Sequence, residues 1–233
     1  RCGHGIATYR DHHTDPRRNP SIIPVTQITK LAVPWRSANA ERLSIPKLWI
    51  VGDIRVGEWT QLSEMDGPAG FLKVRGRRYR YPDGNEDVWD ILVGGTTVAI
   101  IALTEDDQVI VARQYRPGPG RILLELPGGN ADGDEPVEVA AARELLEETG
   151  YEAASVEVVM QTYLASYASH RRHAVLARGC RKVAEPTLDD GEFVETVLMP
   201  VREFIEHVLG GQLTDTDMAF AGLTAAGYLK PTI

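Results

Sequence analysis

The 233-residue chain has little cysteine, no long apolar run and a deficit of positive charge. Its two cysteines, Cys2 and Cys180, are too few for a disulfide framework, so we expect a reducing, cytoplasmic environment. No apolar run reaches the roughly 18 residues that a membrane span needs, and no secretory signal is recognisable. The formal net charge of −8 argues against general binding to nucleic acid or to anionic membranes.

Three regions follow one another along the chain. Residues 1–44 are polar and show no clear hydrophobic period, so we predict a disordered tail there. Residues 45–92 show strand patterns and a turn signal at Pro82-Asp83-Gly84, which predict a β-rich extension. The basic and aromatic stretch at 73–81 is too short to indicate RNA binding in an acidic chain. Residues 93–229 form the main domain.

The main domain mixes strand and helix patterns. Thr97–Leu103 is a near-continuous apolar run, which predicts a strand buried on both faces. Gln108–Arg116 follows an acidic turn and is predicted to be its hairpin partner. The next helix has Asp134 or Glu135 as the predicted N-cap and Gly150 as the C-terminal cap. Further strands are predicted over 122–126, 156–163, 173–177 and 194–199, and helices over 201–209 and 217–229, which gives an α/β fold class.

Three carboxylates on the central helix point to a metal ion. Glu144, Glu147 and Glu148 stand at positions i, i+3 and i+4, so they project from one face of the helix. Like charges at this spacing destabilise a helix by about 0.2–0.5 kcal/mol per pair, so a positive group is expected among them. Mg²⁺ is normally held by one or two carboxylates together with substrate phosphates. The pattern therefore predicts a metal-dependent enzyme that acts on a phosphorylated substrate.

The same stretch resembles the signature box of the Nudix hydrolases, with one departure at Tyr151, where the family usually has Leu, Ile or Val. The resemblance implies an α/β/α sandwich with a mixed sheet, here preceded by the N-terminal β-rich extension. It also implies hydrolysis of a diphosphate bond. The matching residues are Gly129, Glu135, Arg143, Glu144, Leu145, Glu147, Glu148 and Gly150.

The resemblance assigns roles to these residues. It makes Glu144, Glu148 and the carbonyl of Gly128 ligands of Mg²⁺, with Mn²⁺ as a substitute, and it makes Glu147 an additional ligand and catalytic residue. Glu135 and Arg143 would form a salt bridge that braces the loop against the helix and supports catalysis. The catalytic base is expected from the late acidic loop at 185–192, with Glu192 as first choice and Asp190 as second.

The residues around the box resemble the ADP-ribose pyrophosphatase branch of the family. Arg113-Gln114-Tyr115-Arg116, a Gly/Pro loop and then Leu124–Gly129 carry this resemblance. It implies a nucleoside diphosphate sugar as the substrate, with ADP-ribose giving AMP and ribose 5-phosphate. Arg116 and Arg113 would bind the substrate phosphates, and Glu125 would reach the metal or substrate region. The extension at 45–92 would support a homodimer.

Two alternatives stay open at this point. Tyr167 stands about where ADP-ribose hydrolases carry a proline, and a tyrosine there is more typical of dinucleoside polyphosphate hydrolases. A Nudix domain can also serve as a non-catalytic nucleotide sensor, although the intact Glu144, Glu147 and Glu148 argue against that. The basic segment 170–173 is interpreted either as a phosphate contact or as a solvated loop.

Overall fold

The computed structural model describes residues 70–230, together with Ile50, Val51, Val56, Gly57, Thr60, Leu62 and Gly67. The predicted tail at residues 1–44 lies outside the described residues, as does most of the segment 45–69. No helix in the described part of the chain is long and apolar enough to cross a membrane.

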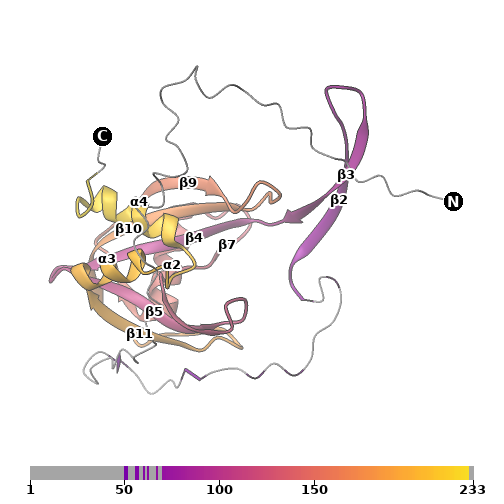
Figure 1. Ribbon diagram of the computed structural model, residues 1–233. Coiled ribbons are helices and arrows are strands. Elements are labelled where there is room, and N and C mark those ends of the chain that lie inside the picture. Colours follow the sequence, from indigo (N-terminus) through magenta and orange to yellow (C-terminus); the bar gives the residue numbers. More distant parts are fainter. Residues whose placement is uncertain are drawn as a thin grey trace, which may run out of the picture. The chain divides into compact units, whose positions relative to one another are not determined.

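A mixed sheet forms the centre of the main domain (Figure 1). Its central strand β4 (Thr96–Thr104) pairs antiparallel with β5 (Gln108–Arg116) and parallel with β10 (Arg171–Lys182). The strand order is β1-β11-β5-β4-β10-β8, with β6 on β5, β7 on β4 and β9 on β10. The remaining strands are β1 (Ile50–Val51), β6 (Arg121–Glu125), β7 (Asn130–Ala131), β8 (Tyr151–Glu152), β9 (Ser155–Tyr163) and β11 (Val194–Pro200).

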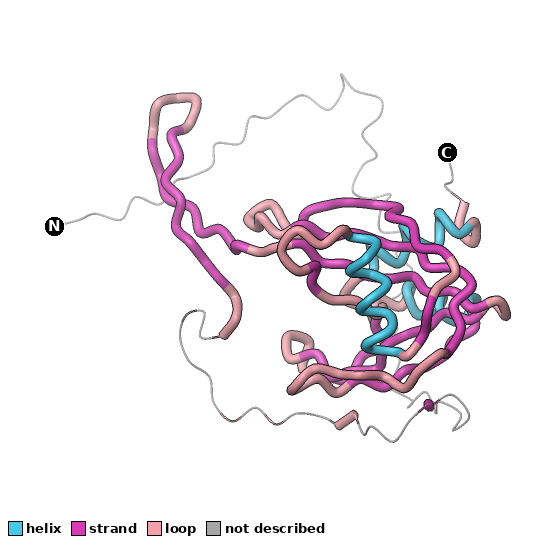
Figure 2. The backbone as a smooth tube through the Cα atoms, turned by 180° about the vertical axis from the view of Figure 1, so that it is seen from behind, coloured by secondary structure: helices cyan, strands magenta, loops and turns pink. Residues whose placement is uncertain are grey.

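Alternate residues of β4 divide the core into two layers. Ile101 and its neighbours of the same parity pack with α3 (Val201–Leu209) and α4 (Thr216–Ala226), whereas Ile100 and its neighbours pack with α2 (Val137–Thr149). Successive side chains of a strand point to opposite faces, so a continuous apolar run needs cover on both. The helices lie on the two sides of the sheet (Figure 2). The predicted α/β/α sandwich is confirmed.

The ends of helix α2 agree with the prediction at one terminus only. Gly150 is the C-cap in the left-handed conformation, with φ at 73°, and its N–H donates to the carbonyl of Leu146. The predicted N-cap at Asp134 or Glu135 is wrong, because Pro136 occupies that position and no side chain caps the helix. The carboxylate of Glu135 is engaged elsewhere, with the N–H of Asp132 and with Arg143.

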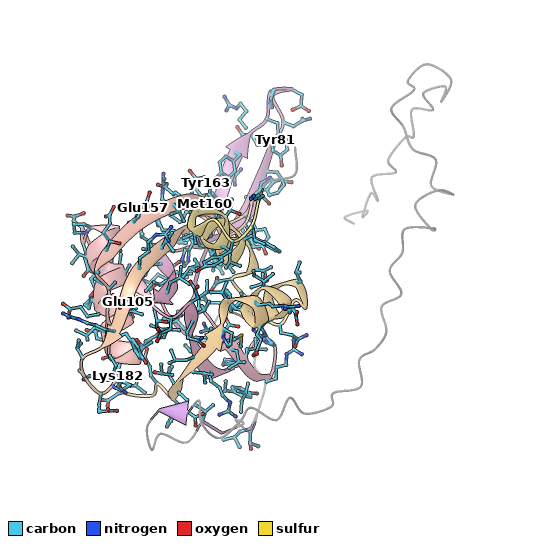
Figure 3. All side chains as sticks on the ribbon, turned by 90° about the vertical axis from the view of Figure 1, so that its left-hand side faces the viewer. Tyr81, Glu105, Glu157, Met160, Tyr163 and Lys182 are labelled. Atoms are coloured by element: carbon cyan, nitrogen blue, oxygen red, sulfur yellow. The ribbon has the colours of Figure 1, made fainter. Side chains whose placement is uncertain are left out.

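Within the predicted β-rich extension, β2 (Lys73–Arg80) and β3 (Glu86–Val93) form a separate hairpin, whereas β1 pairs with β11 of the main sheet. Every residue of β2 is exposed, and so are the first five of β3. The base of the hairpin is bound to the main domain, since the N–H of Leu92 donates to the carbonyl of Tyr167 at 2.9 Å. Figure 3 shows Tyr81 on this hairpin and Tyr163 on β9.

Candidate active site

Helix α2 and the loop before β11 enclose an acidic cavity of about 160 Å³. Six of its lining side chains are carboxylates and only one is a guanidinium, so the cavity attracts cations strongly. The three predicted metal ligands from the helix all reach it, and Glu192 reaches it from the loop. The full lining is Gly129, Asn130, Asp132, Arg143, Glu144, Glu147, Glu148, Thr187, Asp189 and Glu192.

Arg143 connects most of the acidic wall. Its guanidinium contacts Glu135 at 3.0 Å, Glu144 at 3.0 Å and Glu147 at 2.9 Å. It also donates to the carbonyl of Asn130 at 2.9 Å. The hydrogen bond from Arg143 lowers the pKa of Glu135, and a second one from the N–H of Asp132 acts in the same direction. The predicted brace between Glu135 and Arg143 is therefore present, and it also positions two of the helix carboxylates.

Glu148 is the carboxylate most strongly affected by burial. Its residue is only 6 % exposed, and burial raises its pKa to about 8. The N–H of Gly128 donates to its Oε2 at 2.9 Å and lowers the pKa in part, while the charges of Glu144 and Glu192 raise it further. Burial also raises the pKa of Glu144. Glu144 is paired with Arg143, whereas Glu148 has no ion pair within the described residues, so a bound cation would favour the charged form of Glu148 most.

The glycine turn beside this cavity has no room for side chains. The carbonyls of Pro127 and Gly129 accept backbone hydrogen bonds from β4 at 2.9 Å each, which fixes the turn. At Gly128, with φ at 154°, a Cβ would stand 2.1 Å from the carbonyl oxygen of Val98. At Gly129 it would stand 2.5 Å from the carboxylate of Glu144. Glycine at both positions lets the backbone approach the acidic wall closely.

The donor set fits a hard divalent cation. Carboxylate and carbonyl oxygens are the ligands that Mg²⁺ prefers. The carbonyl of Gly128 accepts no backbone hydrogen bond from the described residues, so it is available to an ion. As the side chains stand, no three potential ligands within the described residues are spaced to enclose one. Arg143 donates to one oxygen of Glu144 and to one oxygen of Glu147, and the other oxygen of each carboxylate receives no hydrogen bond from it.

The late acidic loop is fixed against the end of helix α2. The N–H of Thr187 donates to the carbonyl of Glu147 at 2.8 Å. Within the loop, the N–H of Asp189 donates to the carboxylate of Glu192 at 3.2 Å, and the N–H of Glu192 donates to the carbonyl of Asp189. Glu192 and Asp189 line the acidic cavity, whereas Asp190, the second predicted candidate for the base, does not.

A second cavity of about 350 Å³ adjoins the acidic one, and the two share Gly129 and Asn130. Arg116 lies in its wall, beside the fully buried Glu125 at 3.6 Å. Glu125 accepts hydrogen bonds from both the N–H and the hydroxyl of Thr214, at 3.1 and 2.5 Å. Glu125 therefore lies behind the wall of this second cavity and positions Arg116 and Thr214, and its place in the metal or substrate region stays a prediction.

The opposite wall of this second cavity comes from the start of β10 and of α4. Arg172 contacts Asp215 at 2.5 Å and Asp217 at 2.9 Å. His170 lies 2.9 Å from the hydroxyl of Thr97, and its pKa is lowered by burial and by the charge of Arg172. The interpretation of residues 170–173 as a solvated loop is wrong, because Arg172 and both histidines line the cavity.

Arg113 is predicted to bind phosphate, but it lines neither cavity. It stands three residues before Arg116 on β5, and an odd separation along a strand puts two side chains on opposite faces. Its guanidinium contacts Glu195 on β11 at 2.6 Å, and Glu195 also accepts a hydrogen bond from the N–H of Val56. Arg113 therefore joins neighbouring strands on the other side of the sheet.

Sequence reasoning missed Thr97, Thr214 and Asp215 as cavity residues. Thr97 opens an apolar strand, and its hydroxyl is unremarkable by sequence. Thr214 and Asp215 lie between two predicted helices, where polar residues are common and carry no recognisable motif. Only the tertiary packing of α4 on β4 and β10 brings them to the site.

Comparison with known proteins identifies the family and the fold. Residues 93–215 match the family model of the NUDIX domain. The chain belongs to the Nudix hydrolase family. This Nudix protein is 32 % identical over 177 residues to an ADP-ribose pyrophosphatase of Mycobacterium tuberculosis, a match that covers 72 % of this chain and 85 % of that protein. The predicted resemblance is confirmed.

Other relatives carry related names. An ADP-ribose pyrophosphatase of Bacillus subtilis is 30 % identical over 142 residues, covering 60 % of this chain and 77 % of that protein. A methanol dehydrogenase activator of Bacillus methanolicus is 28 % identical with the same coverage of each chain. The crystal structure of an ADP compounds hydrolase superposes with a TM-score of 0.60 at 21 % identity, covering 76 % of this chain and 97 % of that one, which shows a shared fold.

We expect Glu148→Gln to stabilise the metal-free protein at alkaline pH but not at acidic pH. The unfolded carboxyl ionises near its ordinary pKa of 4.5, whereas the folded one keeps its proton up to about 8. The wild type therefore loses stability as the pH rises from the unfolded pKa through the folded one, and this loss is a few kcal/mol, since one pKa unit is worth about 1.4 kcal/mol.

Urea unfolding in EDTA at about pH 5 and about pH 8.5 measures this effect. Glu138→Gln, at an exposed position on the same helix, is the matched control and should differ little from wild type at either pH. An unchanged stability difference between Glu148→Gln and wild type across the two pH values would contradict the raised pKa.

Proposed function

We propose that this Nudix hydrolase cleaves the diphosphate bond of a nucleoside diphosphate sugar such as ADP-ribose, with Mg²⁺ as cofactor. Water is added across the bond, so ADP-ribose gives AMP and ribose 5-phosphate. The observation that supports this most is the pair of adjoining cavities, one acidic and one lined by both polar and apolar residues, which meet at Gly129 and Asn130. A diphosphate at the junction would place its metal-binding oxygens beside α2 and one substituent in the larger cavity. Two ADP-ribose pyrophosphatases among the relatives support the substrate class.

The metal would be held by Glu144, Glu147, Glu148 and the carbonyl of Gly128, and Mn²⁺ is the expected substitute for Mg²⁺. When bound, such an ion neutralises phosphate oxygens and lowers the pKa of a coordinated water. The chain itself supplies the placement of these ligands. Arg143 orients two of the carboxylates, and the glycine turn brings a backbone carbonyl within reach of the same cavity.

Glu192 is the proposed catalytic base. It lines the acidic cavity from the loop before β11, and its charge raises the pKa of both Glu144 and Glu148. A group in that position can accept a proton from a water that attacks phosphorus beside the helix carboxylates. The hydrogen bond from the N–H of Asp189 orients it.

The two alternatives have less support. The dinucleoside polyphosphate reading depends on Tyr167, whose side chain is 57 % exposed and lines neither cavity. A non-catalytic sensor would not need all three helix carboxylates, nor Glu192 beside them. The low cysteine content supports a cytoplasmic location, as proposed from the sequence.

A panel assay tests the activity. ADP-ribose, ADP-glucose, UDP-glucose, GDP-mannose and diadenosine polyphosphates are incubated with the protein, Mg²⁺ and a phosphatase, and released phosphate is measured beside an EDTA control. We expect EDTA-sensitive turnover that is greatest for ADP-ribose. Glu148→Gln should lower kcat by about a hundredfold or more while the protein stays folded, because a metal ligand is lost. Tight binding of one compound without turnover would favour the sensor instead.

Glu192→Gln tests the base, with Asp190→Asn as the matched control. Each change removes one carboxylate from the same loop, but only Glu192 lines the cavity. We expect Glu192→Gln to lower kcat by about 10²–10⁴-fold, the usual contribution of a general base. Asp190→Asn should remain within about twofold of wild type. Equal losses in both variants would assign the effect to the charge of the loop.

We also propose a homodimer formed through the β2–β3 hairpin. Val74 and Val88 are exposed on one face of the hairpin, and Tyr79 and Trp89 on the other, each at 42 % or more. An isolated two-stranded hairpin is marginally stable in water, so both faces need cover that the described residues do not give. A second copy of the chain provides it.

Light scattering of the full-length protein measures its mass. We expect a dimer for the wild type and a monomer for Val88→Ser with Trp89→Ser. The control is Asp87→Ser with Asp90→Ser, which changes the flanking polar positions of the same strand and should leave the dimer intact. A monomeric wild type would refute the proposal.

A further inference from the structure

We propose that the ion pair between Arg113 and Glu195 positions Glu192, the proposed catalytic base. This inference rests on the proposed function and gives a task to two residues that lie outside both cavities. The family resemblance makes Arg113 a phosphate ligand, but its guanidinium contacts β11 instead. Neither residue of the pair touches the acidic cavity, so any effect on the reaction passes through another group.

Glu195 is a buried carboxylate with one partner on each oxygen. The residue is only 7 % exposed. Its Oε2 accepts from Nη1 of Arg113 at 2.6 Å, and its Oε1 accepts from the N–H of Val56 at 2.9 Å. Glu195 and Arg113 stand directly opposite each other where β11 pairs with β5. A buried carboxylate is costly unless charge and hydrogen bonds compensate it, so this contact holds the start of β11 in one arrangement.

Glu195 stands where the acidic loop joins the sheet. Strand β11 begins at Val194, and Glu192 lies three residues before Glu195. Three residues of extended chain span at most about 10 Å, so a shift of Glu195 is passed on to Glu192. Arg113 also stands opposite Leu124 of β6, the strand that leads into the glycine turn. The ion pair therefore connects the loop of the base to the strands beside the acidic cavity.

The hydrogen bonds of the loop itself hold Glu192 weakly. The N–H of Asp189 donates to the carboxylate of Glu192, and the N–H of Glu192 donates back to the carbonyl of Asp189. Both residues are exposed, and hydrogen bonds exposed to water open readily. The position of Glu192 thus depends on the two ends of the loop. These are the bond from Thr187 to α2 and the pair at Glu195 on β11.

A positioning pair and a phosphate ligand change different kinetic constants. Loss of a phosphate ligand weakens substrate binding and raises KM, whereas a displaced base lowers kcat. We expect Glu195→Gln to lower kcat about tenfold, because small misplacements of a catalytic group are costly. In a Glu192→Gln background the same change should lower kcat by no more than about twofold, since the base that it positions is already absent.

The test is a double-mutant cycle of kcat for ADP-ribose in Mg²⁺, measured with the full-length protein. Arg113→Gln should match Glu195→Gln, with KM within about twofold of wild type, and Arg113→Lys should recover most of kcat because it keeps the charge. Glu152→Gln is the matched control. It removes the glutamate from another directly opposed pair, with Arg181, at the opposite edge of the sheet, and kcat should stay within about twofold.

Two kinetic outcomes would overturn the inference. If the losses of Glu195→Gln and Glu192→Gln multiply in the double variant, Glu195 acts on the fold in general and not through the base. If Arg113→Gln raises KM and leaves kcat unchanged, Arg113 is a phosphate ligand as the family resemblance implies.

Hydrogen exchange gives a readout that needs no turnover. In Glu195→Gln the amides of residues 189–196 should exchange about tenfold faster than in wild type, with those of α2 unchanged. Glu152→Gln should change neither. Unchanged exchange at 189–196 would overturn the inference even in an active enzyme. Faster exchange there, in a protein that hydrolyses no compound of the panel, would refute the proposed function alone.

Thermal unfolding accompanies each variant. If Glu195→Gln does not fold, Glu195→Asp replaces it, because an aspartate keeps the charge but is one methylene too short to hold both partners. We expect a smaller loss of kcat that is again absent in the Glu192→Gln background, together with faster exchange at 189–196. Wild-type kcat and exchange in Glu195→Asp would refute the positioning role.

Discussion

The acidic wall of the site depends on one guanidinium group, that of Arg143. Without it, the carboxylates of α2 would face one another across a small, partly buried cavity, with the repulsion that such spacing brings. Its bonds to Glu135, to two helix carboxylates and to the Asn130 carbonyl tie the glycine turn to the helix. Glu148 stays outside this network. Burial raises its pKa, so a cation bound beside it would favour the loss of its proton.

The buried central strand decides where the two cavities lie. Because alternate residues of β4 serve two core layers, helices must cover both faces of the sheet, and the turn at Gly129 and Asn130 lines both cavities beside the start of β4. Helix α2 brings the acidic groups to this turn from one face. Helix α4 brings Thr214 and Asp215 from the other, and the shared turn at Gly129 joins them. The polarity of the two cavities thus follows from which helix supplies each wall.

Local patterns in the sequence predicted much of this arrangement. The run at Thr97–Leu103 and the C-cap at Gly150 were predictable because each reflects a local physical requirement, burial on both faces and a left-handed turn. The N-cap prediction was wrong because the helix begins after Pro136, and the carboxylate of Glu135 instead contacts Arg143, eight residues along the chain. Arg113 was misplaced even though strand alternation separates it from Arg116. Asp215 could not be predicted, because its partner Arg172 lies 43 residues away and no spacing rule connects them.

The carbonyl of Gly150 accepts hydrogen bonds from Val183 and Ala184, and the next anchor of that segment is the bond from Thr187 to Glu147. Beyond Thr187 the chain passes through the loop that carries Glu192 and enters β11 at Val194. The position of Glu192 in the cavity therefore depends on the length of the loop between Thr187 and Val194 rather than on the helix that carries the proposed metal ligands. An insertion or deletion there would move the proposed proton acceptor while leaving the metal ligands in place. In such a fold the position of the proposed base can change while the proposed metal ligands stay where they are.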